Sequence, residues 1–117
     1  MMRDMRVYVQ DMMECIEVIG EYIQSLTEEE FYRNRQVQDA VLRRLEIIGE
    51  AVKNIDEDFR NRYAEIPWKK IAGLRDVLIH EYFGVNMKRV WRVIKIDLPD
   101  LKSKISRIWE ELKPVSR

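Results

Sequence analysis

Apolar residues recur along the chain at intervals of three and four, which is the spacing of one face of an α-helix. The first such stripe runs over residues 4–26 and comprises Val9, Met12, Met13, Ile16, Ile19 and Ile23. The second runs over residues 35–55 and comprises Val37, Val41, Leu45, Ile48 and Val52. Charged residues fill the opposite positions, so each segment predicts a helix with one buried and one solvated side.

Capping and turn residues divide the middle of the chain into further elements. Thr27 and Glu30 have the pattern of a capping box, which predicts a second helix start directly after the first long helix. A short turn is expected at residues 57–63. Pro67 then suits the first position of a helix, which we expect to end near Phe83.

The C-terminal part of the chain carries two more helical signals. Gly84 is a natural stop for the preceding helix, and Asn86 can cap the helix that follows. Residues 97–99, Asp-Leu-Pro, are expected to break or restart that helix before a last helical segment. No segment of the sequence shows the sustained two-residue alternation of a strand. The pattern predicts an all-α, up-and-down bundle of about four main helices with one or two short ones, as a single domain over residues 1–117.

Composition excludes several classes of protein. The sequence has 21 basic and 21 acidic side chains, and this net charge of zero argues against binding of nucleic acid by bulk charge. No apolar run approaches the length of a membrane span, and residues 1–8 lack the apolar segment of a secretory signal. The lone cysteine, Cys15, permits no intrachain disulfide, so we expect a cytoplasmic protein.

The same counts limit the metal sites that the chain could hold. One cysteine and one histidine cannot build a zinc site within a single chain. A magnesium site made of carboxylates alone stays open, although no dense acidic motif suggests one. We therefore expect neither a metal nor a cofactor.

The two halves of the chain carry opposite charge. Residues 1–58 contain 7 basic and 14 acidic side chains, whereas residues 59–117 contain 14 basic and 7 acidic ones. One interpretation is that the charged faces of the helices simply solvate themselves. The other is that the second half carries a surface for an anionic partner, such as RNA or a nucleotide phosphate.

The only histidine, His80, lies in the helix predicted from Pro67 onwards. Asp76 precedes it by four residues on the same face, where a carboxylate could orient the imidazole and raise its pKa. Arg75 lies five residues before His80, about 140° around the helix. The two groups could meet through the length of the arginine, or across a two-fold axis in a dimer.

These residue types suggest a chemistry, although each also has a structural interpretation. Histidine can move protons near neutral pH, and arginine can stabilise charge on a phosphate, so the set is compatible with a metal-independent ribonuclease. A helical histidine is otherwise more often a packed or surface residue. Arg75 could form a surface ion pair, and Tyr82 could be a core aromatic near the end of the helix.

Two segments resemble the HEPN-domain toxins of the HepT type. They are PWKKIAGLRDVLIHEYFGVNMKRVWRVIKIDLPDL at residues 67–101 and QDAVLRRLEIIGEAV at residues 38–52. The most specific element is the family signature R-x4-H-x-Y, which here is Arg75, His80 and Tyr82. The resemblance implies a small all-α ribonuclease that forms homodimers. It also implies that the arginine and histidine of both chains line a shared cleft and act as the catalytic pair.

The resemblance further implies a partner and a means of silencing. Toxins of this kind are paired with a minimal nucleotidyltransferase, an MNT-type antitoxin, which uses ATP to transfer AMP onto the signature tyrosine, here Tyr82. Asp76 carries over as a supporting polar residue at a place where relatives often have asparagine. AMP close to His80 would exclude RNA from the cleft by its bulk and its negative charge.

Basic residues flank the signature on both sides. They are Lys69, Lys70, Lys88, Arg89 and Arg92. They either follow an RNA backbone or are solvated surface residues.

Two further functions stay open. The chain could be a non-catalytic helical partner of a nucleotidyltransferase, which would bind a substrate or nucleotide through Arg75 and His80 without cleaving it. It could also be a purely structural helical dimer, which leaves the grouping of signature residues unexplained. Toxicity on expression without a partner would favour the ribonuclease over the binding partner.

Overall fold

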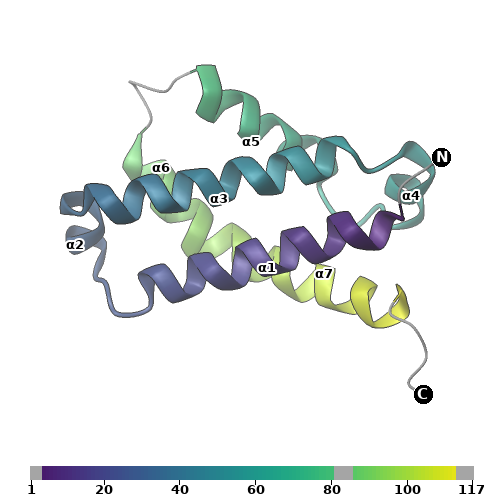
Figure 1. Ribbon diagram of the computed structural model, residues 1–117, viewed down its shortest axis with the longest axis horizontal. Helices are drawn as coiled ribbons and strands as arrows, with labels where there is room; N and C mark the ends of the chain where they lie inside the picture. Colours follow the sequence, from purple (N-terminus) through teal and green to yellow (C-terminus); the bar gives the residue numbers. More distant parts are fainter. Residues whose placement is uncertain (1–3, 81–85, 113–117) are drawn as a thin grey trace.

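A computed structural model describes residues 4–80 and 86–112, and it describes side chains for residues 4–74 and 86–112. Within these ranges the chain is helical and contains no strand, which confirms the predicted all-α class (Figure 1). The elements in chain order are α1 (Met5–Ile23), α2 (Glu28–Arg33), α3 (Arg35–Lys53), α4 (Glu57–Arg62), α5 (Trp68–His80), α6 (Met87–Arg92), η1 (Val93–Asp97) and α7 (Leu98–Leu112).

The long helices alternate in direction, as in the predicted up-and-down bundle. Figure 1 shows α1 and α3 running side by side in opposite directions, with the short α2 at their turn. Helix α5 then returns along α3, and α6, η1 and α7 run back as one continuous helical stretch that packs on α1. Four long helical runs and the two short helices α2 and α4 match the predicted bundle.

The apolar stripes of α1, α3 and α7 form the core. Every member of the two predicted stripes is buried except Met13 and Val37, which are half-buried. Helix α7 adds Ile105 and Ile108, both almost fully inaccessible. Burying one such aliphatic side chain contributes about 1.5–3 kcal/mol, so this three-helix contact supplies much of the stability of the fold.

The predicted capping box at α2 is confirmed. The Glu30 N–H donates to the Thr27 hydroxyl oxygen at 3.1 Å, and the Thr27 N–H donates to the Glu30 carboxylate at 2.9 Å. Asn86 likewise caps α6, because its side-chain oxygen accepts the N–H of Lys88 at 2.9 Å. Both caps satisfy backbone N–H groups that have no partner within their own helix.

The turn predicted at residues 57–63 is wrong in kind, because the chain forms the helix α4 there. The Asp56 carboxylate accepts the N–H of Phe59 at 2.9 Å and so caps the helix start. The helix dipole also stabilises α4. Its acidic residues, Glu57 and Asp58, lie in the first turn, and arginines lie in the last turn. Six residues are too few for a helical period to stand out in the sequence.

The discontinuity expected at residues 97–99 is present, but the chain does not break there. A π-helical turn, η1, joins α6 directly to α7, and the Leu98 N–H bonds the carbonyl of Val93 five residues back. Pro99, the second residue of α7, has no N–H and would clash with the preceding turn of a regular α-helix. The wider π turn accommodates the proline ring without ending the helix.

The predicted C-terminal end of α5, near Phe83 and Gly84, lies outside the described residues. Among the helices that the structure describes, none is long and apolar enough to cross a membrane. The single-domain organisation and the cytoplasmic location stay predictions.

Candidate functional site

Helix α5 carries Arg75, Asp76 and His80, and its first turn is fixed to α4 through Trp68. The indole N–H of Trp68 donates to the carbonyl of Tyr63 at 3.1 Å and to that of Arg60 at 3.2 Å. The Trp68 ring also packs edge-on against Phe59 and is only 5% exposed. This contact sets where α5 begins, and α5 then packs along α3.

The signature residues lie on the C-terminal half of α5 and beyond it. The backbone is helical through His80, so the predicted spacing of Arg75, Asp76 and His80 holds along the helix. The side chains of these three residues, and the whole of Tyr82, lie outside the described part of the structure. Their catalytic, supporting and modification roles stay predictions.

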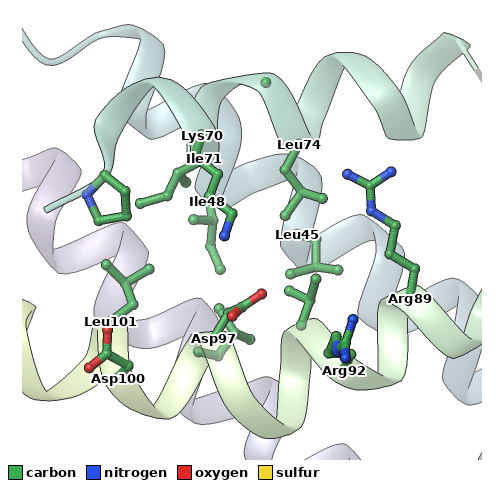
Figure 2. A pocket seen from close by; sticks show the side chains of 14 residues that line it. Leu45, Ile48, Lys70, Ile71, Leu74, Arg89, Arg92, Asp97, Asp100 and Leu101 are labelled. Atoms are coloured by element: carbon green, nitrogen blue, oxygen red, sulfur yellow. The ribbon is translucent and has the colours of Figure 1, made fainter.

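A groove lies along the described half of α5. It separates α5 from the continuous helix of α6, η1 and the start of α7, and α3 forms its floor (Figure 2). Its volume is about 610 Å³. Its apolar lining residues are Leu45, Ile48, Pro67, Ile71, Leu74, Val93, Leu98 and Leu101, together with Gly73. The groove therefore has an apolar floor next to the helix that carries the signature.

Three basic side chains line this groove. Lys70 comes from α5, and Arg89 and Arg92 come from α6. Figure 2 shows the Lys70 amine pointing from α5 into the groove and the Arg89 guanidinium lying below the C-terminal half of α5. Within the described residues none of the three is in an ion pair. Their charge is thus available to an anion.

The structure brings together only part of the basic set predicted from the sequence. Lys69 and Lys88 are exposed on α5 and α6, but they do not line the groove. Lys69 instead borders a shallower hollow beside α4, together with Arg60 and Asn61. Neighbours in sequence point in different directions on a helix, so Lys70 and Arg89 face the groove and Lys69 and Lys88 do not.

Two aspartates line the groove that the sequence does not predict as site residues. Asp100 lies 3.1 Å from the amine of Lys104, one turn further along α7. Asp97, at the end of the π turn, has no ion-pair partner within the described part of the chain. Figure 2 shows its carboxylate directed into the groove from the wall opposite α5. No local sequence signal distinguishes Asp97 from a helix-breaking residue beside a proline.

Residues 4–74 and 86–112 bring together no group of three histidine, cysteine or acidic side chains that could hold a metal ion. Cys15 is buried in the core, and burial raises the pKa of its thiol. The described part of the site therefore consists of cations, one free carboxylate and an apolar floor. Such a surface suits a ligand that has both phosphate and a flat apolar base.

A family model described as "Ribonuclease HepT-like" matches residues 12–108. A "Probable ribonuclease HepT" from Thermococcus cleftensis is 44% identical over 108 residues, which cover 92% of this chain and 98% of that protein. A Methanocaldococcus jannaschii protein named "Gamma-glutamylcyclotransferase and putative RNase" is 48% identical over 112 residues. This alignment covers 96% of the chain but only 50% of that relative, so the chain spans about half of its length.

No solved structure gives a significant match to the chain. The family match covers most of the sequence, from within α1 to within α7, and it includes all of the signature helix. The resemblance first noted in the signature and in residues 38–52 is confirmed by these matches. The chain belongs to the HepT-like ribonuclease family.

Proposed function

We propose that this protein is the toxin of a toxin–antitoxin pair and cleaves RNA at a cleft shared by two copies of the chain. The family match supports the ribonuclease class. The observation that carries the proposal is the groove along α5, where Lys70, Arg89 and Arg92 line a surface beside the helix that bears Arg75 and His80. An RNA backbone held by these cations would run past the signature.

The reaction requires only groups that the protein and RNA provide. The His80 imidazole accepts the proton of the ribose 2′-hydroxyl, and the 2′-oxygen attacks the adjacent phosphorus. The bond from phosphorus to the 5′-oxygen breaks, and the imidazolium returns its proton to that oxygen. Arg75 stabilises the charge on the phosphorane, and Asp76 supports this pair. The products are a 2′,3′-cyclic phosphate and a 5′-hydroxyl, and neither metal nor cofactor takes part.

Cleavage of a single-stranded RNA in EDTA, with analysis of the new ends, tests this mechanism. The wild type is expected to leave a 2′,3′-cyclic phosphate, and His80→Ala and Arg75→Ala are each expected to lose activity by at least about a hundred-fold. Arg33→Ala is the matched control, since Arg33 is exposed on α2 and its contact with Glu29 is a surface ion pair. Cleavage that EDTA abolishes, or that survives both signature substitutions, would contradict the mechanism.

Mixing two inactive variants tests the shared cleft. If each site takes Arg75 from one chain and His80 from the other, a heterodimer of Arg75→Ala and His80→Ala contains one intact site. An equimolar mixture is then expected to recover about a quarter of the wild-type activity after subunit exchange. No recovery, despite exchange shown by mass spectrometry, would place both groups in a single chain.

Silencing is proposed to occur at Tyr82 through an MNT-type nucleotidyltransferase. The phenolic oxygen attacks the α-phosphorus of ATP, pyrophosphate leaves, and the phenol proton passes to solvent. Tyr82→Phe is expected to cleave RNA but to accept no AMP when the antitoxin and ATP are added. Tyr32→Phe is the control, because the Tyr32 hydroxyl donates to Glu28 at 2.8 Å on α2. AMP transfer to Tyr82→Phe would refute this assignment.

The groove also supports a second function, in which the chain binds a nucleotide for a nucleotidyltransferase without cleaving RNA. Its cations and apolar floor would serve either role. Expression without the partner separates the two functions. Growth arrest that His80→Ala relieves supports the ribonuclease, whereas harmless expression supports the binding partner.

A further inference from the structure

The groove between α5 and the π turn has features that RNA backbone binding alone does not explain. A basic strip would suffice to hold phosphates, yet this groove has an apolar floor, the Asp97 carboxylate, which has no ion-pair partner among residues 4–74 and 86–112, and a glycine in one wall. We infer that it binds one nucleotide of the RNA substrate, with its base inside, and that Asp97 selects guanine. This inference rests on the proposed ribonuclease function and names the substrate feature that the enzyme recognises.

The floor and size of the groove suit a base. Leu45 and Ile48 of α3 lie at the back, and Leu74 of α5 and Val93 of η1 lie on opposite walls. Single-stranded RNA presents its bases unstacked, and proteins bind them on apolar surfaces and through the hydrogen-bonding edge. The volume of about 610 Å³ is within the range of small-ligand sites.

Asp97 supplies the selective group. A carboxylate only accepts hydrogen bonds, so the ligand must present donors to it. The Watson–Crick edge of guanine has two adjacent donors, the ring N–H and the exocyclic amine, which match the two carboxylate oxygens. Adenine and cytosine each offer an amine beside an acceptor, and uracil offers a ring N–H between two acceptors. Guanine is therefore the base that a free carboxylate in this position favours.

The cations place the phosphate at the end of the groove nearer the signature. In Figure 2, Asp97 lies near the middle of the groove, and Arg89 lies towards the C-terminal half of α5. A nucleotide with its base at Asp97 can thus direct its phosphate to Arg89, close to the helical turns that bear Arg75 and His80. The guanine would belong to a nucleotide next to the bond that is cleaved.

Gly73 leaves room for an occupant in the wall of the groove. It lines the groove from the interior of α5, where glycine lowers helix stability relative to alanine. A Cβ built at Gly73 meets no atom within 4 Å, so packing within the described chain does not require glycine. A ligand lying against the backbone of α5 would use this open space, which a methyl group would fill.

The first experiment measures kcat/KM for short RNAs that differ only in the base beside the cleaved bond. The wild type is expected to prefer guanine by about ten-fold or more, and Asp97→Asn is expected to lose most of this preference. Asp100→Asn is the matched control: it makes the same charge change in the groove, but that carboxylate is paired with Lys104, so the preference should remain. An unchanged preference in Asp97→Asn would overturn the inference.

The second experiment measures binding of guanosine monophosphate by calorimetry, which needs no cleavage. Gly73→Ala is expected to raise the Tm and to weaken binding by about ten-fold, because the added methyl group occupies the ligand's place. Gly20→Ala is the control, since Gly20 lies in the interior of α1 with equally open space around its Cβ position. It should raise the Tm and leave binding unchanged.

The outcomes separate this inference from the proposed function. If Arg75→Ala abolishes cleavage while Gly73→Ala binds the nucleotide as well as the wild type does, the ribonuclease stands and the guanine site falls. If guanosine monophosphate binds at Asp97 but Arg75→Ala still cleaves RNA, the proposed mechanism falls and the site stands. If Gly73→Ala instead dissociates the dimer in sedimentation, a second copy occupies the groove, and the inference is overturned.

Discussion

The contact of α1, α3 and α7 and the groove along α5 are built on opposite principles. The buried residues of the described chain include no charged or polar side chain, and the three helices present regular apolar stripes to one another. The groove instead keeps Lys70, Arg89 and Asp97 without ion-pair partners among the described residues. The three helices are organised for stability, whereas the groove presents exposed charges that a ligand could bind.

The irregular features of the described helices lie mainly on the groove side. The π turn of η1 contributes Val93 and Asp97, Pro99 follows directly, and Gly73 interrupts the side chains of the opposite wall. Such departures from regular helix reduce stability and persist at functional sites. The charged residues of the groove lie outside the buried core and can be altered separately from it, whereas Leu45 and Ile48 belong to both.

The largest effect is expected from Ile105→Ala in α7. Ile105 is 0% exposed, so its truncation leaves a cavity in the core on the side where α7 packs on α1 and lowers the free energy of unfolding by about 2–5 kcal/mol. Urea denaturation measures this change. Ile96→Ala is the control, because Ile96 is 62% exposed and should change stability by less than about 0.5 kcal/mol. Equal effects of the two variants would contradict the assigned core.

A smaller effect is expected from Trp68→Phe, which tests how α5 is held at the border of the two regions. Phenylalanine keeps the ring packing but removes the donor to the carbonyls of Tyr63 and Arg60. Leaving a buried acceptor without its partner lowers the free energy of unfolding by about 1–3 kcal/mol. Hydrogen exchange should also quicken in the first turns of α5. A variant as stable as the wild type would show that this bond does not fix the helix.

Lys70→Gln and Arg89→Gln are expected to weaken RNA binding without changing the stability of the fold. Each is expected to change the free energy of unfolding by less than about 0.5 kcal/mol, since neither side chain has an ion pair among the described residues. Each should lower the slope of log K against log salt for RNA binding by about 0.7, as expected for one lost phosphate contact. Lys102→Gln, on the exposed side of α7, should leave the slope unchanged. An unchanged slope in the groove variants would exclude them from RNA contact.

The last prediction leaves the sequence unchanged and uses the reactivity of the Cys15 thiol to test whether the core is closed. Burial raises the pKa of this thiol above its ordinary value of 9.0, despite the Arg44 guanidinium 3.9 Å from the sulfur. At a given pH less thiolate is present, so alkylation should be slow in the native protein and should rise only at more alkaline pH. In urea the rate should reach that of a free thiol. Equal native and denatured rates would contradict a closed core.

Much of the fold follows from local pattern. The apolar period identifies Ile19 and Leu45 as core residues, because a helix repeats its buried face every three or four residues. The capping box at Thr27 is local too, since all of its atoms come from four consecutive residues. Helix α4 was missed because its six residues hold too few apolar positions to show a period.

The groove could not be predicted from local sequence pattern in the same way. Lys70 and Arg89 could be singled out as basic neighbours of the signature, but so could Lys69 and Lys88, which do not line the groove. The Asp-Leu-Pro pattern predicts a helix break at Asp97, because proline usually ends a helix. The π turn keeps the helix continuous, and Asp97 at its end faces the groove.

The sequence by itself determined the helical class, the two long apolar stripes and the family. These features depend on residues close together along the chain or on a motif. Only the tertiary structure decided that Leu45, Lys70 and Asp97 surround one groove. They lie on three different helices, and their meeting depends on how those helices cross and where a turn widens. No local pattern contains that information.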